Sequence, residues 1–250
     1  MKHKGVYDYW QKRANEREDP FDISGNDTVL ASLEIRYLRK YLPTGCKVLE
    51  IGCSAGRVIK ELVKTHPNSY YGIDFSENMI NKAVSLRLPD CRFDVQDILS
   101  YEKDNCCDVV YSVRCIINLL DSQDHLKMIE RIAHWLKSKG KVILLEATKE
   151  GLDKINQYRK IAGLEQIVPH EFNNYIDLSS FMPRFEKYFS FEIVEFASSY
   201  YLASRLFNAF VAKLESRPMQ YEDPINILGA KLPVFADFAP HKMIIGRKKS

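Results

Sequence analysis

A short apolar run that leads directly into a glycine-bearing turn and then into a helix constrains this sequence most. Residues 48–58 read VLEIGCSAGRV, which is typical of a strand, a tight turn and a helix start. A ligand can approach a glycine backbone closely, because glycine has no Cβ. The N–H groups of the helix start point at the same place. We therefore expect Gly52 and Gly56 to line a ligand site, although such a turn can also be a plain strand-to-helix connection.

Short apolar runs alternate with amphipathic helical stretches from Cys46 to Thr148. Strands are expected at 47–51, 70–74, 91–95, 108–113 and 141–146, and a helix is expected from Asp121 or Ser122 to Gly140. Two later runs, 191–196 and 242–246, add two strands. Successive β-α-β units predict an α/β fold with a mostly parallel sheet.

The 250 residues, of which 46% are hydrophobic, can bury one full core, so a single domain is expected. Residues 1–44 are predicted to form an N-terminal helical cap, with helices near 7–18 and 28–41 separated by a breaker-rich stretch at 19–27. Residues 45–148 form the core. The irregular segments 149–190 and 197–240 are expected insertions on either side of the sixth strand.

Acidic side chains follow the first three predicted strands, at the edge where parallel strands end. Asp74 ends the second strand, where a carboxylate can accept both hydroxyls of a ribose. Asp97 follows the third strand and suits an exocyclic amine. Glu50 lies just before the glycine turn. An exposed turn aspartate is the alternative for Asp74.

This arrangement of acids and glycines resembles the class I S-adenosylmethionine-dependent methyltransferases from about Cys46 to Thr148. The resemblance implies a Rossmann-like, doubly wound sheet of seven strands, the last of them antiparallel. It implies S-adenosylmethionine as the methyl donor, S-adenosylhomocysteine as the product and no metal. The implied cofactor contacts are Glu50, Gly52, Ser54, Gly56, Asp74, Phe75, Asp97, Ile98 and Arg114.

Each implied contact has a role in that resemblance. The turn residues line the methionine portion, Asp74 holds the ribose, Asp97 takes the adenine amino group, and Arg114 closes the pocket near the sulfonium. Phe75 and Ile98 sandwich the adenine. Ser54 departs from the family pattern, which usually has a glycine there.

A nicotinamide dinucleotide is the natural rival ligand for such a turn. Its fingerprint requires G-x-G-x-x-G, and the spacing of Gly52 and Gly56 does not match it. The Glu50 carboxylate would also repel a pyrophosphate, whereas the ammonium and sulfonium of S-adenosylmethionine are cationic.

The acceptor side is expected in two segments, 166–175 and 198–205, which are similar to segments of methyltransferases that modify sugars and surface polysaccharides. Methyl transfer is an in-line displacement, which needs a base only when the acceptor is a hydroxyl. His170 is the candidate base, because imidazole titrates near neutral pH, with a surface or structural histidine as the alternative. Tyr200, Tyr201 and Arg205 can bind a hydroxylated ligand or simply pack.

Composition limits the other function classes. The net charge of +3 is spread along the chain, so no nucleic-acid footprint is expected. There is no signal peptide or membrane-spanning stretch, so a cytoplasmic enzyme without membrane insertion is expected. We predict methyl transfer to a small polar acceptor, preferably an oxygen of a sugar-derived molecule. A non-catalytic cofactor-binding scaffold and an RNA methyltransferase are the alternatives, and the oligomeric state is open.

Overall fold

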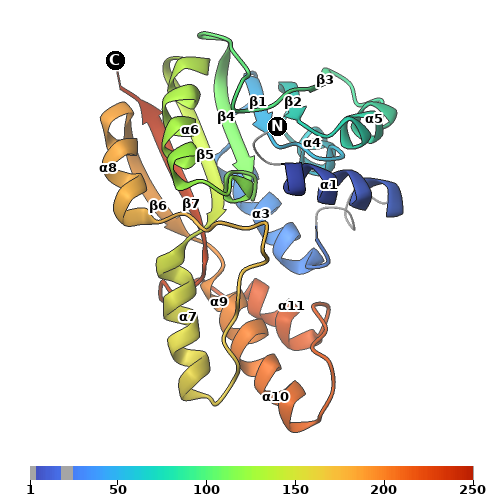
Figure 1. Cartoon of the computed structure of the whole chain (residues 1–250), viewed down its shortest axis with the longest axis vertical. Helices are drawn as coiled ribbons and strands as arrows, with labels where there is room; N and C mark the ends of the chain where they lie inside the picture. Colours follow the sequence, from blue (N-terminus) through green and yellow to red (C-terminus); the bar gives the residue numbers. More distant parts are fainter. Residues whose placement is uncertain (1–3, 18–24, 250) are drawn as a thin grey trace.

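A computed structural model of the chain describes residues 4–17 and 25–249 (Figure 1). Residues 18–24, which include most of the predicted breaker stretch, lie outside the described residues, as do residues 1–3 and 250.

Seven strands form one sheet in the order β3-β2-β1-β4-β5-β7-β6. Strands β1 to β5 are parallel to one another, with β1 paired to β2 and β4, β2 to β3, and β4 to β5. Strand β7 pairs antiparallel with both β5 and β6. The predicted fold class, a Rossmann-like sheet with an antiparallel last strand, is confirmed. The strands are β1 (Lys47–Ile51), β2 (Ser69–Asp74), β3 (Cys91–Val95), β4 (Cys107–Val113), β5 (Leu136–Ala147), β6 (Phe189–Glu195) and β7 (His241–Lys248).

Most helices begin at a side-chain cap that the sequence supplies. Asp27 accepts from the Leu30 N–H, and Ser76 accepts from the Met79 N–H. The helical elements are α1 (Lys4–Glu16), α3 (Thr28–Tyr41), α4 (Arg57–Leu62), α5 (Glu77–Ser85), the 3-10 turn η1 (Ile116–Asn118), α6 (Ser122–Trp135), α7 (Lys149–Ile161), α8 (Leu178–Tyr188), α9 (Ser198–Tyr201), the π-helical η2 (Leu202–Phe207), α10 (Asn208–Leu214) and α11 (Pro224–Lys231).

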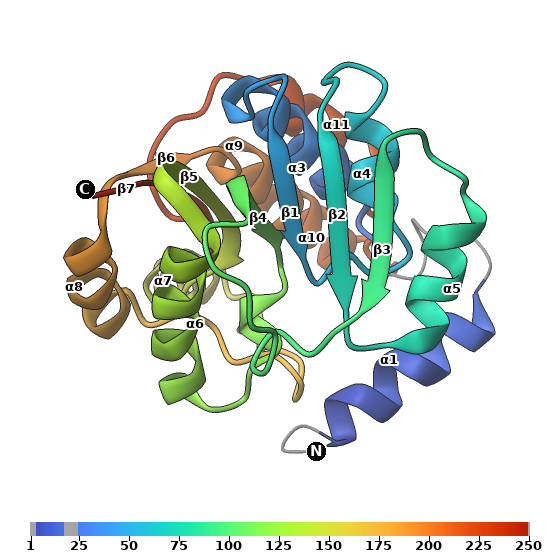
Figure 2. The same cartoon turned by 90° about the horizontal axis from the view of Figure 1, so that it is seen from above.

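The sheet is covered on both faces, as its near-continuous apolar strands require. Leu33 and Leu38 of α3 and Ile59 of α4 belong to the core on one face, and Ile129 of α6 and Phe185 of α8 belong to the core on the other. Figure 2 shows α3 and α4 on one side of the sheet and α6 and α8 on the opposite side.

Two expectations from the sequence are wrong. Helix α6 ends at Trp135 rather than at Gly140, because Leu136 is already extended and starts β5. The segment expected to be irregular, 149–190, contains α7 and α8. Helix α7 buries only Gly151 and Ile155, and α8 carries Pro183 in its interior.

Helices α7, α9, α10 and α11, together with η2, form a lobe beyond the carboxyl edge of the parallel strands (Figure 1). The lobe is built from residues 149–161 and 198–231. Within the described ranges, no helix has the length and apolar character needed to cross a membrane.

Candidate functional site

A cavity of about 310 Å³ lies at the carboxyl ends of β1 to β4, and we call it the edge cavity. Ligands of open α/β sheets bind at this edge. Its lining comes from the predicted turn, the three acids, the end of β4 and helix α1. The lining residues are Val6, Tyr7, Trp10, Glu50, Gly52, Cys53, Ser54, Arg57, Val58, Asp74, Phe75, Met79, Val95, Gln96, Asp97, Ile98, Val113, Arg114, Cys115, Asn118 and Leu119.

The glycine turn has three residues with left-handed backbone: Gly52 (φ +67°), Ser54 (φ +50°) and Gly56 (φ +78°). A Cβ at Gly52 would overlap the side chain of Cys115, whose Cβ would be 2.6 Å away. From the sequence, the space next to Gly52 was expected to hold part of a bound ligand. The structure shows instead that Gly52 permits close packing with Cys115, while its backbone still lines the cavity.

Asp74 links the turn to the next helix. Its Oδ2 accepts from the Ser54 N–H and its Oδ1 accepts from the Ser76 N–H, both at 2.9 Å. Burial raises the pKa of Asp74 to about 6, and the two N–H bonds oppose that rise. At neutral pH the group is therefore a carboxylate held in a fixed orientation, which suits it to accept hydroxyl hydrogens.

Glu50 is the least satisfied acid of the cavity. It is 2% exposed, and among the described residues its Oε2 has no hydrogen-bond partner. Burial raises its pKa to about 8, although the neighbouring Tyr111 hydroxyl and the charge of Arg57 lower it. A buried carboxyl oxygen without a hydrogen-bond partner destabilises the folded protein when the site is empty. A cationic ligand group would offset that destabilisation.

Two arginines from different elements meet one carboxylate behind the cavity. Glu34 of α3 is fully buried, and it lies 3.0 Å from the Arg114 Nε and 3.8 Å from an Arg57 Nη. Arg114 directly follows β4 and has φ +54°. The sequence pattern predicted Arg114 as a site residue but did not predict Arg57. The position of Arg57 immediately after Gly56 is the signal that could have identified it.

The opposite end of the cavity carries the predicted adenine contacts. Phe75 and Ile98 both line it, and Phe75 also packs against Tyr7 of α1 with ring centroids 5.6 Å apart. Asp97 is exposed, and its Oδ1 accepts from the Leu99 N–H at 2.9 Å. These three side chains are thus placed together as expected.

Helix α1 forms a wall of the cavity. The Trp10 indole N–H donates to the Asn118 Oδ1 at 3.2 Å, and the Gln11 Oε1 accepts from the Ser76 hydroxyl at 2.7 Å. Both bonds join α1 to segments that follow strands. The Trp10 indole both packs against neighbouring apolar side chains and lines the cavity.

Two predicted site residues do not line the edge cavity. The position of a Gly56 Cβ faces Leu86 and Ala83 of the neighbouring α5 region, and the Gly56 N–H donates to the Cys53 carbonyl, so this glycine shapes the turn. His170 is exposed, with its ring against Tyr9 of α1 at 5.3 Å. Its role as a general base stays a prediction.

Comparison with known proteins agrees with this geometry. Residues 48–140 match the family model described as a methyltransferase domain. Residues 48–140 therefore carry a methyltransferase domain. The resemblance that the sequence suggested, including its S-adenosylmethionine-dependent class, is confirmed, and the match covers β1 to the start of β5.

The relatives of the methyltransferase domain act on different acceptors. Phosphoethanolamine N-methyltransferase 1 of Triticum aestivum is 33% identical over 107 residues, 41% of this chain and 21% of that protein. The malonyl-[acyl-carrier protein] O-methyltransferase of Bacillus cytotoxicus is 31% identical over 147 residues, 55% of this chain and 48% of that protein. The aligned part spans about a fifth of the first curated relatives.

A solved structure resembles the whole chain. Haemonchus contortus phosphoethanolamine N-methyltransferase 1, in complex with phosphoethanolamine and S-adenosylhomocysteine, superposes with a TM-score of 0.63 at 13% identity. The match covers 98% of this chain and 49% of that one. The methyltransferase fold therefore extends beyond the segment that the family model matches.

Proposed function

We propose that the protein transfers a methyl group from S-adenosylmethionine to a small polar acceptor. The observation that carries this proposal is the buried Glu50 carboxyl group, whose Oε2 has no partner among the described residues, facing the same cavity as Asp74, Phe75 and Ile98. An ammonium group satisfies Glu50, a ribose satisfies Asp74, and an adenine fits between the two apolar side chains.

The cofactor supplies an activated methyl group on a sulfonium. The chain's own residues therefore have to bind the two substrates, orient them and exclude water. Asp74 is held rigidly by two backbone N–H groups, which pre-orients it for the ribose. Tyr7 and Trp10 of α1 close one side of the cavity against solvent. Arg114, fixed by Glu34, borders the end nearest the lobe.

The acceptor is defined only by class. The relatives named above include an N-methyltransferase and an O-methyltransferase, so the sugar oxygen expected from the sequence stays a prediction. Deprotonation by His170 and a cytoplasmic location also stay predictions. The cap and the two insertions are proposed to enclose the acceptor, because α1 and the lobe border the carboxyl edge of the sheet.

Calorimetric titration with S-adenosylhomocysteine tests the cofactor half of the proposal. Wild-type protein should bind stoichiometrically, and Asp74→Ala should lose at least about tenfold in affinity, since a charged hydrogen bond contributes about 1.5–3 kcal/mol. Asp108→Ala is the matched control, because Asp108 lies at the opposite end of the sheet, bonded to Lys47 and Lys137. Absence of binding, or equal affinity in the Asp74 variant, would overturn the assignment.

A further inference from the structure

A second polar cluster lies in the lobe, outside the edge cavity. Arg205 belongs to the π-helical segment η2, and its Nη2 lies 2.5 Å from the Asp27 Oδ2. Its guanidinium lies over the rings of Tyr200, Tyr201 and Tyr221, with the nearest centroid, that of Tyr221, at 4.8 Å. We call these residues, together with His241, the Arg205 cluster.

Two polar atoms of this cluster are buried without a partner among the described residues. One is the Arg205 Nη1, and the other is the Nε2 of His241. His241 is 6% exposed, and its Nδ1 is 2.6 Å from the Tyr201 hydroxyl. An unpaired buried donor costs about 1–3 kcal/mol, so two in one cluster indicate that a ligand completes it.

Helix α3 connects the Arg205 cluster to the edge cavity. Asp27, its N-cap, holds Arg205, and Glu34, seven residues later, holds Arg114 at the cavity. Two helical turns separate the two carboxylates, a distance of about 10 Å along the axis. This spacing is about the length of a small metabolite.

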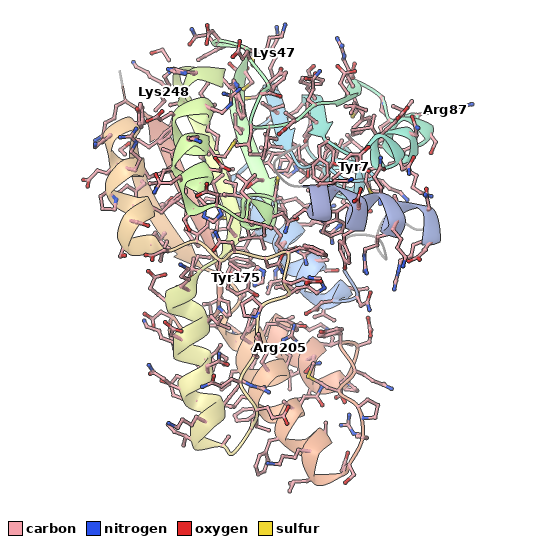
Figure 3. The ribbon with its side chains drawn as sticks, viewed as in Figure 1. Tyr7, Lys47, Arg87, Tyr175, Arg205 and Lys248 are labelled. Carbon is pink, nitrogen blue, oxygen red and sulfur yellow. The ribbon has the colours of Figure 1, made fainter. Side chains whose placement is uncertain are left out.

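His241 lies within electrostatic range of both Arg114 and Arg205. It pairs with Ala147 in the sheet, at the edge where Arg114 follows the neighbouring β4. Burial, and then the charges of Arg114 and Arg205, lower the pKa of His241 to about 3. The same two guanidinium groups oppose the burial that raises the pKa of Tyr175. Figure 3 labels Tyr175 at the level where the lobe meets the sheet and Arg205 within the lobe.

The charges select the chemistry of a ligand here. Arg114 and Arg205 would repel a cation, and their paired carboxylates are already engaged by them. A neutral hydroxyl can accept from both donors, but its hydrogen bonds to a guanidinium group are weaker than those of an oxyanion. A phosphoryl or carboxyl group has several acceptor oxygens and can accept from Arg205 and from a protonated His241 Nε2 at the same time.

We propose that the Arg205 cluster binds an oxyanion group of the acceptor, phosphoryl or carboxyl, while the atom to be methylated reaches toward the edge cavity. This inference rests on the proposed methyl transfer and adds the acceptor's chemical class. The π-helical turn at Leu202–Phe207 supports it, because single π-helical turns occur frequently at functional sites. An anion bound here would also favour the charged form of His241.

Titration of the protein saturated with S-adenosylhomocysteine tests this inference, with inorganic phosphate and acetate as separate probes at constant ionic strength. The readout is the imidazole Cε1–Hε1 NMR signal of His241, assigned by its loss in His241→Gln. We expect a saturable shift at concentrations up to about 50 mM for at least one probe. The stronger probe identifies the phosphoryl or the carboxyl group.

Arg205→Lys keeps a positive charge beside Asp27 but loses the forked guanidinium group. This variant should bind the anion about tenfold more weakly, while its affinity for S-adenosylhomocysteine should stay within about twofold of the wild type. Arg217→Lys, at a half-buried ion pair of the same lobe, is the control and should behave as wild type. No saturable shift, or the same shift in Arg205→Lys, overturns the inference. Failure to bind S-adenosylhomocysteine instead overturns the proposed function.

Discussion

Ser54 is the one residue of the glycine turn that adopts left-handed backbone with a side chain. Its φ of +50° costs about 1 kcal/mol relative to glycine, and its N–H is committed to Asp74. This geometry explains why a glycine is usual at the position, and it keeps Ser54 in the cavity lining. The turn is therefore strained slightly in order to orient Asp74.

Gly52 provides a residue-scale prediction. Gly52→Ala adds left-handed strain and an overlap with Cys115, so it should lower the free energy of unfolding by about 2–4 kcal/mol. Gly45→Ala is the control, because Gly45 has φ +71° but no heavy atom within 4 Å of its Cβ position, and it should lose only about 1 kcal/mol. Urea unfolding of both variants measures the difference, and equal losses would show that the overlap is relieved by relaxation.

Glu50 provides a second prediction at the residue scale, which concerns the pH dependence of cofactor binding. With a pKa of about 8 in the unliganded protein, Glu50 is mostly protonated at pH 7, and a bound ammonium group favours the carboxylate. Binding of S-adenosylhomocysteine should therefore release close to one proton at pH 7, and affinity should rise with pH until about pH 8. Calorimetry in buffers of different ionisation enthalpy measures the proton.

Glu50→Gln should release no such proton. Equal proton release in this variant would assign the titration to another group. The same raised pKa has the opposite sign for folding, because Glu50 binds its proton more tightly in the folded chain than in the unfolded one. Its contribution to the stability of the unliganded protein is present at acid pH and is lost as pH rises through about 8.

At the scale of elements, the strands were predictable and the lobe was not. The apolar run of β1, the glycine turn and Asp74 are local in sequence, so their order along the chain places them at one edge of the sheet. Helix α1 meets that edge only through tertiary contacts. The helices α7 and α10 bury few side chains, so little of the apolar core marks them in the sequence. The pairing of Arg205 with Asp27 joins residues 178 positions apart, which no local pattern indicates.

Helix α1 gives the prediction at this scale. Trp10→Ala removes a large half-buried side chain from the wall of the cavity and should weaken S-adenosylhomocysteine binding about tenfold, chiefly through faster dissociation. Trp10→Phe keeps the apolar wall but loses the bond to Asn118, so its effect should be smaller. Stopped-flow fluorescence measures the dissociation rate.

Ile161→Ala is the control for helix α1, because Ile161 lies on α7 and is 84% exposed. Its dissociation rate should equal that of the wild type. A Trp10→Ala variant with the same rate as the control would mean that α1 does not hold the cofactor.

At the scale of the whole molecule, the sheet supplies the proposed donor site, and helix α1 and the lobe border the same edge of the sheet. Helix α3 carries one carboxylate toward the edge cavity and one toward the Arg205 cluster, so the two sites share a single rigid element. The fold and most of the lining of the edge cavity could be predicted from the sequence, because both depend on strand order. The proposed acceptor site depends on how the lobe packs onto α3. The sequence alone could therefore not decide whether Tyr200, Tyr201 and Arg205 bind a ligand or only pack.

A crystal structure of the protein with S-adenosylhomocysteine tests the central claim most directly. We predict density for the ligand in the edge cavity, with the ribose hydroxyls within hydrogen-bond distance of Asp74, the adenine between Phe75 and Ile98, and the ammonium group at Glu50. Density for the ligand at any other place, or the ligand in the cavity with its adenine at Glu50, would contradict the account.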